Sequence, residues 1–111
     1  MKKISFDEQL YKNKSITDLI LYSIYSISEK KEKCTFEKLV KECFTLFPRA
    51  FGLSQYPKWP DSRKLDRPLR TLRKRKLITG NPKTIFSLTK KGLKLAEEIT
   101  KSFKQKRLKL D

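Results

Sequence analysis

The sequence predicts a mainly α-helical fold that carries one small β-hairpin. Apolar residues recur every three or four positions in four segments, which is the spacing of a helix with one buried face. Two runs of β-branched and aromatic residues flank the turn-forming residues 80–83, which is typical of a hairpin. The 111 residues, 37% of them hydrophobic, suffice for one packed domain but not for two.

We expect three parts along the chain. Residues 1–14 are polar and form either a short helix or an arm. One weak helical face there holds Ile4, Phe6, Leu10 and Tyr11. Residues 15–103 form the folded domain, and residues 104–111 form a basic C-terminal tail.

The first helix of the domain is predicted to begin after Ser15. Ser15 and Asp18 resemble a capping box, in which the serine hydroxyl accepts a hydrogen bond from a free backbone N–H of the first turn. The apolar stripe that follows holds Ile16, Leu19, Ile20, Ile24 and Ile27. The charged turn at residues 28–33 ends this helix. Tyr22 and Tyr25 lie off the stripe, where they can line a second contact.

Thr35 is the predicted N-cap of a second helix, and Cys34 and Thr35 together can form a short bridging strand. The apolar positions of this helix are Phe36, Leu39, Val40, Cys43, Phe44 and Phe47. Pro48 stops it, because proline has no N–H to donate. Residues 49–61 contain proline, glycine and aromatic residues and predict an ordered loop. We expect a small apolar cluster beneath this loop, made of Phe51, Tyr56 and Trp59; the alternative is that these rings contact a ligand directly.

Five of the seven arginines lie within residues 63–75, and leucines recur among them at helical spacing. Proline is tolerated only in the first turn of a helix, so Pro68 predicts a short turn at 62–65 followed by a helix over 67–76. A helix that begins at Ser62 and kinks near Pro68 is the alternative. The inward positions are Leu69, Leu72 and either Lys76 or Leu77.

Residues 77–79 and 84–88 form the predicted hairpin around Gly80-Asn81-Pro82-Lys83. Thr89 can cap a last helix directly after the returning strand. The predicted core face of that helix is Leu93, Ala96, Ile99 and Phe103.

Two stretches of this region carry a resemblance to a known family. "LRTLRKRKLI" (69–78) runs directly into the hairpin, and "FSLTKKG" (86–92) leads from the returning strand into a capped helix. This arrangement resembles a winged helix-turn-helix domain, as in bacterial and archaeal regulators of the PadR and MarR type, over residues 15–103. The resemblance implies a three-helix core, a hairpin wing and a C-terminal helix. It also implies a transcriptional regulator or DNA-docking subunit, often a homodimer, that inserts helix 67–76 into the major groove.

The formal net charge of +16 agrees with a polyanionic partner, of which nucleic acid is the commonest. Arginine is a planar fork that fits phosphate oxygens and the guanine edge, so an arginine-rich helix face predicts contact with double-stranded DNA. The alternative is a solvated basic face. The predicted DNA-binding residues are Arg63, Arg67, Arg70, Thr71, Arg73, Lys74, Lys83, Lys90 and Lys91.

Lys83 lies at the predicted hairpin tip, and Lys90 and Lys91 lie in the first turn of the last helix. The helix dipole disfavours cations at that end, unless a phosphate binds the free N–H groups there. Gly92, next to them, serves either close approach of a ligand or tight packing.

Several classes of function are not expected. The chain has no histidine, only two cysteines, no glycine-rich phosphate loop and no acidic cluster, so we expect no enzyme, no metal and no cofactor. Its first ten residues are too polar for a secretory signal, and no apolar run approaches the roughly 20 residues of a membrane span. We therefore expect a cytoplasmic protein, nucleoid-associated if bacterial or archaeal. RNA binding stays open, as does an adaptor that docks a protein through Tyr22, Tyr25, Phe51 or Trp59.

Overall fold

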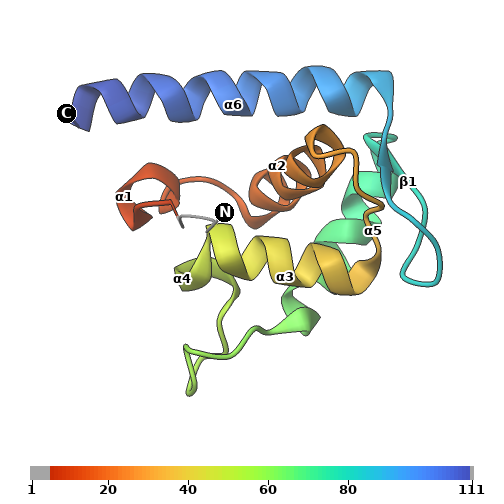
Figure 1. The fold of residues 1–111 in the computed structure, drawn as a ribbon, viewed down its shortest axis with the longest axis horizontal. Helices are drawn as coiled ribbons and strands as arrows, with labels where there is room; N and C mark the ends of the chain where they lie inside the picture. Colours follow the sequence, from red (N-terminus) through yellow and green to blue (C-terminus); the bar gives the residue numbers. More distant parts are fainter. Residues whose placement is uncertain (1–5, 111) are drawn as a thin grey trace.

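The computed structural model describes the backbone of residues 6–110 and the side chains of residues 6–105, so the expectation for Ile4 lies outside the described residues. The fold is mainly helical with one two-stranded antiparallel sheet, as the sequence predicts (Figure 1). The elements are α1 (Glu8–Tyr11), α2 (Ile16–Glu29), α3 (Phe36–Leu46), α4 (Pro48–Phe51), the 3-10 turn η1 (Ser62–Leu65), α5 (Asp66–Lys74), β1 (Ile78–Thr79), β2 (Ser87–Leu88) and α6 (Lys90–Leu110).

Helix α2 is the centre of the fold, because α3, α5, α6 and β2 all pack against it. The predicted cap is confirmed: the hydroxyl of Ser15 accepts a hydrogen bond from the backbone N–H of Asp18 at 3.1 Å. The buried hydrophobic residues of α2 are Leu19, Ile20, Leu21, Ile24 and Ile27. Full burial of each such side chain contributes about 1.5–3 kcal/mol, so this one helix supplies much of the stability of the core.

Helix α3 packs beside α2 and begins at the predicted cap, since the hydroxyl of Thr35 accepts from the backbone N–H of Lys38 at 3.2 Å. Pro48 ends α3 as predicted, but it also opens the short helix α4, where its missing N–H would be unpaired in any case. Cys34 and Thr35 are not a regular strand. A single backbone hydrogen bond, from the N–H of Phe86 to the carbonyl of Cys34 at 2.9 Å, joins this segment to the chain before β2.

A cluster of aromatic rings joins the N-terminal segment to the long last helix. The ring of Phe6 lies 5.3 Å from that of Phe47 and 5.1 Å from that of Phe103, and Tyr22 packs edge-on against Phe103 at 5.1 Å. The Phe6 pairs are tilted and the Tyr22 pair is edge-on, and an edge-on arrangement is one of the favourable geometries for aromatic pairs. Tyr22 therefore makes the second contact that its position off the stripe predicts.

Helix α5 follows η1, which confirms a short turn before the helix and places Pro68 in the first turn. The helix ends at Lys74, two residues before the predicted end. Lys76 adopts a left-handed conformation with φ 60°, and the N–H of Leu77 bonds the carbonyl of Leu72 at 3.0 Å. This is a Schellman motif, which stops a helix without requiring glycine. Leu77, not Lys76, closes the apolar stripe.

The hairpin has the predicted position but shorter strands. Ile78 pairs with Leu88, and Thr79 pairs with Ser87. Residues 84–86 do not pair with the first strand, because Asn81 closes a turn of its own. Its backbone N–H bonds the hydroxyl of Thr84 at 3.0 Å, and its carbonyl accepts from the N–H of Thr84 at 2.9 Å.

Helix α6 begins after Thr89, whose hydroxyl accepts from the backbone N–H of Gly92 at 3.0 Å and so confirms the cap. Ala96, Ile99 and Phe103 are buried as predicted, but Leu93 is 43% exposed, which contradicts its predicted core position. The buried stripe starts instead at Gly92, four residues before Ala96, and Leu93 lies one residue off that stripe. The helix continues unbroken through the domain boundary predicted after residue 103.

Within the predicted loop at 49–61, the expected apolar cluster is wrong for two of its three members. Phe51 is buried, on α4, but Tyr56 and Trp59 are each 65% exposed. The loop closes on its own backbone and projects from the body of the molecule (Figure 1), so its aromatic side chains do not fold back onto the core. Because Phe51 is buried, it is not available as a docking residue for a protein partner.

Candidate nucleic-acid interface

Helix α5 separates its leucines from its cations. Leu69 and Leu72 are 3% and 1% exposed, and they lie three residues apart on the buried side. The arginines and the lysine of α5 lie at other positions of the helix and are exposed, because successive residues of a helix are rotated by about 100° around its axis. We call the outward set the α5 basic face, and its members are Arg67, Arg70, Thr71, Arg73 and Lys74.

The α5 basic face has little neutralising charge. Between residues 43 and 96 the chain holds 14 lysines and arginines against two aspartates, Asp61 and Asp66. Asp61 lies 3.6 Å from Arg63, whose side chain is nonetheless 84% exposed. Within the described residues, neither Arg67 nor Arg70 has a carboxylate within ion-pair distance or a hydrogen-bond partner. Their charge is therefore left for solvent or for a ligand.

Position along the helix separates these cations further. Arg73 and Lys74 lie in the last turn, where the negative end of the helix dipole stabilises a positive charge. That interaction gives them a structural reason to be basic. Arg67 lies in the first turn, where the dipole disfavours a cation, and Arg70 lies between the two ends. The helix dipole therefore gives Arg67 and Arg70 no comparable structural reason to be basic.

The hairpin loop lies next to this face. The guanidinium of Arg73 donates a long hydrogen bond, 3.4 Å, to the carbonyl of Gly80. A hollow of about 190 Å³ lies between α5 and the loop and is lined by Asp66, Leu69, Arg70, Arg73 and Pro82. Lys83 is exposed at the loop tip, and its backbone N–H bonds the side-chain oxygen of Asn81 at 2.8 Å. The loop is thus a defined turn that holds Lys83 outward.

Thr89 fastens the start of α6 to the end of α5. Its hydroxyl donates to the carbonyl of Lys76 at 2.7 Å, and its N–H donates to the carbonyl of Leu77 at 3.0 Å. A side-chain carbon placed on Gly92 would lie 1.9 Å from the carbonyl oxygen of Leu77, so Gly92 serves tight packing here. Lys90 and Lys91 occupy the first turn of α6 and are exposed.

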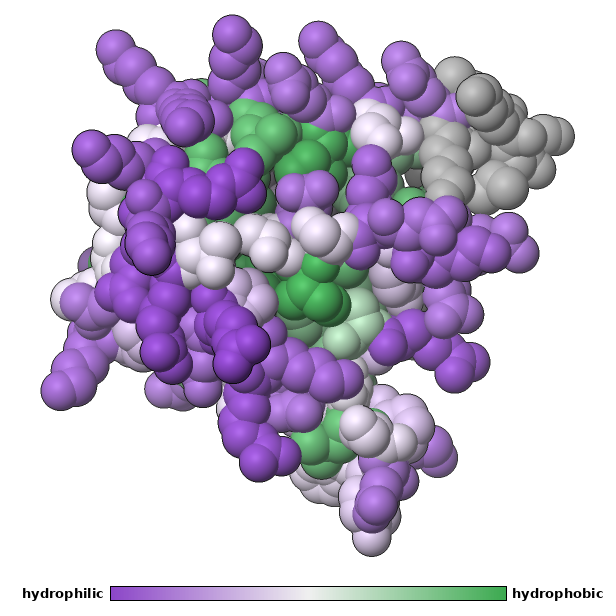
Figure 2. All heavy atoms as spheres, turned by 180° about the vertical axis from the view of Figure 1, so that it is seen from behind, coloured by the Kyte–Doolittle hydropathy of each residue, from purple (hydrophilic) through white to green (hydrophobic). Residues whose placement is uncertain are grey.

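All nine predicted DNA-binding residues are exposed. The hydrogen bonds of Arg73 and Thr89 bring together the three elements that carry eight of these residues: α5, the hairpin loop and the first turn of α6. Figure 2 shows hydrophilic side chains crowded on this side of the molecule, at the left of the view. Arg63 stands one turn before α5, on η1.

The sequence predicts the loop that precedes η1, but the expected burial of its Tyr56 and Trp59 side chains is wrong. We call residues 53–60 the aromatic loop, because it presents Tyr56 and Trp59 to solvent. Its prolines indicated an ordered loop, but they did not show whether the rings point inward or outward. Tyr56 and Trp59 are three residues apart, a spacing that a buried helical face also shows, so their spacing gave no signal that both rings are exposed.

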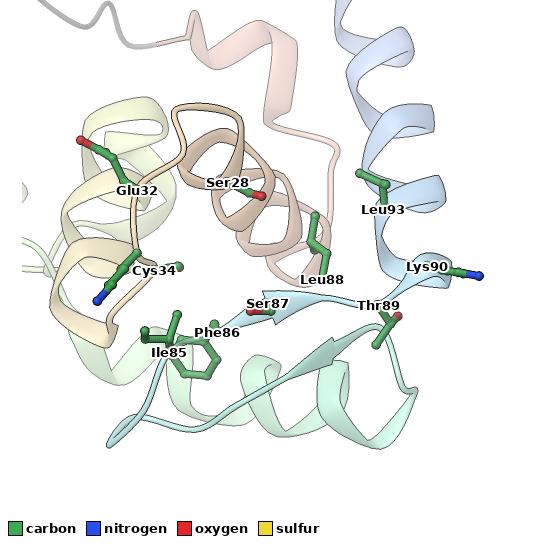
Figure 3. Close-up of a pocket in the computed structure, with 11 residues that line it drawn as sticks. Ser28, Glu32, Cys34, Ile85, Phe86, Ser87, Leu88, Thr89, Lys90 and Leu93 are labelled. Atoms are coloured by element: carbon green, nitrogen blue, oxygen red, sulfur yellow. The ribbon is translucent and has the colours of Figure 1, made fainter.

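A second hollow, of about 420 Å³, lies between the end of α2, the segment 32–34, β2 and the start of α6 (Figure 3). Its rim holds two exposed apolar side chains, Ile85 and Leu93. Cys34 lines it, but burial raises the pKa of this thiol to about 12. It is therefore a neutral thiol near pH 7 and lacks the thiolate that nucleophilic or metal-binding cysteines require.

Two other features are absent from the described residues. No cluster of three or more acidic or cysteine side chains in this part of the chain could hold a metal ion. Over the same residues, none of the helices combines the length and the apolar character that crossing a bilayer demands.

Comparisons of the chain with known protein families, with curated proteins and with solved structures found no match. What the α5 basic face binds has to be inferred from its own chemistry.

Proposed function

We propose that this protein binds double-stranded DNA as a winged helix-turn-helix domain and acts as a transcriptional regulator or as the DNA-docking subunit of a larger system. In this proposal α5 enters the major groove, and the hairpin loop and the first turn of α6 contact neighbouring phosphates. The observation that carries the proposal is the α5 basic face. Its guanidinium groups are exposed on a helix anchored by Leu69 and Leu72, and Arg67 and Arg70 have no carboxylate partner among the described residues.

The dimensions and chemistry of this face suit a major groove. The groove is about 12 Å wide, and an α-helix with its side chains is about 10–12 Å across. Arginine can bond two acceptors of guanine at once, whereas lysine acts as a point charge on phosphates. Arginines dominate α5 and lysines occupy the hairpin tip and the start of α6, which is the division expected of base-reading and phosphate-binding elements.

The order of the elements also supports the proposal. Helices α2, α3 and α5 precede a two-stranded hairpin, and α6 follows it directly. The hydrogen bond from Phe86 to Cys34 attaches the segment before α3 to the hairpin, as a third, minimal strand would. Binding alone is the activity that we propose.

Fluorescence anisotropy with a labelled duplex tests the proposal. With 6–10 phosphate contacts, affinity should fall by about 10³–10⁵ between 50 and 200 mM salt. Arg70→Ala and Arg73→Ala should each weaken binding by about 1–3 kcal/mol if the side chain reads a base, or lower the salt slope by about 1 if it contacts phosphate. The melting temperature of Arg70→Ala should change little, because its side chain is exposed. That of Arg73→Ala should fall slightly, because Arg73 also donates to the carbonyl of Gly80 and lies at the negative end of the helix dipole.

Arg49→Ala is the matched control. It also removes one exposed guanidinium, but Arg49 lies on α4 beside α1, where it lines a hollow with Glu8 and Tyr11. Its affinity for duplex DNA should stay close to that of the wild-type protein. A flat salt response, or equal losses for Arg49→Ala and Arg70→Ala, would contradict a specific role for α5. Tighter binding of structured RNA than of the duplex would identify an RNA-binding protein instead.

A further inference from the structure

The aromatic loop is the second unusual surface of the molecule. Tyr56 and Trp59 are each 65% exposed, whereas every other aromatic residue, all within the described part of the chain, is buried or half-buried. Large aromatic side chains that are left in water gain nothing for the fold. Tyrosine and tryptophan are enriched at interfaces, and exposed apolar groups rimmed by polar residues are typical of binding surfaces.

The loop holds these rings on a rigid frame. Gly52 and Pro60 form an antiparallel bridge at its base, the N–H of Leu53 bonds the carbonyl of Trp59 at 2.8 Å, and the N–H of Trp59 bonds the carbonyl of Tyr56 at 2.9 Å. A side-chain carbon on Gly52 would lie 2.7 Å from the carbonyl oxygen of Pro57, so the base closes tightly. A ligand that stacks on such a frame pays little ordering entropy.

The loop is also fastened to the start of the α5 region. The ammonium group of Lys64, on η1, donates to the carbonyl of Gly52 at 2.7 Å, and the N–H of Asp61 donates to the carbonyl of Phe51 at 2.7 Å. Both bonds join the base of the loop to the turn that leads into α5. In Figure 1 the loop accordingly projects below η1, beyond the end of the helix. A duplex lying on α5 would reach it only with its flank.

The charges around the rings favour a polyanion over an acidic or apolar protein surface. Lys58 lies between the two aromatic residues in the sequence, and Arg63 lines a hollow of about 310 Å³ together with Tyr56 and Asp61. Cations interleaved with exposed rings are the pattern of sites for single-stranded nucleic acid, where bases stack on the rings and phosphates meet the cations. Bases inside a duplex stack on each other and offer no free face to a loop, so the ligand must contain unpaired bases.

We infer that the aromatic loop stacks unpaired nucleotides next to a duplex held on the α5 basic face, so that the preferred ligand is a duplex with a single-stranded flank. This inference rests on the proposed function and narrows its ligand class. Tyr56 and Trp59 provide the stacking surface, and Lys58 and Arg63 contact the phosphates of the flank. Each stacked base adds roughly 5- to 150-fold in affinity.

Trp59 is the only tryptophan in the chain, so its emission reports directly on the loop. The test titrates the full chain with a blunt duplex of about 20 base pairs and with the same duplex extended by about six unpaired nucleotides, a length within the usual site size for single strands. We expect the extended duplex to bind at least about fivefold more tightly and to quench Trp59. The blunt duplex should bind without quenching it.

Variants then separate stacking from charge. Trp59→Ala and Tyr56→Ala should lose the preference for the extended duplex while keeping the affinity for the blunt one, and Trp59→Phe, which keeps a ring, should retain part of the preference. Polyglutamate, a polyanion without bases, should leave Trp59 emission unchanged. If it shifts the emission as the extended duplex does, the loop recognises an acidic polypeptide and the inference is overturned.

Two other results would overturn the inference in distinguishable ways. Equal affinity for the blunt and extended duplexes, with unchanged Trp59 emission, removes the role of the loop but leaves duplex binding by α5 intact. Failure of the wild-type protein to bind either duplex removes the proposed function, and the inference with it.

Discussion

Replacing Gly92 with alanine probes the contact that fixes the start of α6 against the end of α5. Alanine is the better helix former by about 1 kcal/mol, so propensity alone predicts that this change stabilises α6. The structure predicts the opposite. The new methyl group would lie 1.9 Å from the carbonyl oxygen of Leu77, and a backbone atom cannot turn aside as a flexible side chain can.

Relieving that overlap requires α6 to move away from Leu77 by more than an ångström. Such a shift breaks the hydrogen bonds that Thr89 donates to Lys76 and Leu77, at 2.7 and 3.0 Å, each worth about 0.5–1.5 kcal/mol. Overpacking that is not relieved costs about 1–3 kcal/mol instead. After the gain of about 1 kcal/mol in helix propensity is subtracted from either cost, we expect Gly92→Ala to lower the free energy of unfolding by up to about 2 kcal/mol.

Urea denaturation followed by circular dichroism measures this change. Lys94→Ala is the matched control, because it places alanine on the same helix at an exposed position and should shift stability by no more than about 0.5 kcal/mol. A Gly92→Ala midpoint equal to or above that of the wild-type protein would show that α6 does not pack on Leu77 as described. Because the contact also positions Lys90 and Lys91, the variant should bind duplex DNA more weakly under conditions where it remains folded.

Two further perturbations act on the core. Leu72→Ala should lower the free energy of unfolding by about 2–5 kcal/mol, since its side chain is only 1% exposed; an unchanged urea midpoint would mean that the buried face of α5 is misassigned. Burial also raises the pKa of the Cys43 thiol to about 12, above its unfolded value of about 8.5, so the stability it contributes is complete below that lower value and is lost as pH rises toward the upper one. Between about pH 8.5 and pH 9.5 the wild-type midpoint should therefore fall more steeply than that of Cys43→Ala, and parallel slopes would contradict the assignment.

The helices were predictable because their signals are local. Ser15, Thr35 and Thr89 each precede an apolar stripe, and each caps its helix as expected. The helix ends were harder to predict. Lys31 and Lys76 adopt left-handed conformations, with φ 58° and 60°. Glycine is the usual residue at such a position, and a glycine there would have indicated the end of the helix. A lysine in this conformation cannot be distinguished in the sequence from any other surface lysine, so the ends of these helices could not be predicted.

Leu93 and Trp59 show a second limit of prediction from the sequence, because whether each side chain is buried depends on tertiary packing. A leucine one residue from the buried stripe of α6 looks like a core residue until the packing of Gly92 on Leu77 sets the rotation of the helix. Trp59 looks like a buried anchor until the loop is seen to close through its own backbone. The exposed positions of the α5 basic face were predictable, because Leu69 and Leu72 alone determine which side of that helix faces inward. The elements next to this face, the hairpin loop and the start of α6, could not be predicted to lie there, because the hydrogen bonds of Arg73 and Thr89 join residues that are not neighbours in the sequence.

The salt dependence of stability and of DNA binding distinguishes cations that form ion pairs within the fold from cations that are available to bind a ligand. Residues 43–96 hold fourteen lysines and arginines against two aspartates, and the whole chain has a net charge of +16, so the free protein carries strong self-repulsion. Raising NaCl from 50 to 500 mM shortens the screening length from more than 10 Å to less than 8 Å, which weakens this repulsion and should raise the urea midpoint of the free protein. The same change should weaken binding of duplex DNA. Binding releases counterions from the DNA, and that release is less favourable when the salt concentration of the solution is higher. A basic face held by ion pairs within the fold would respond oppositely and lose stability with salt.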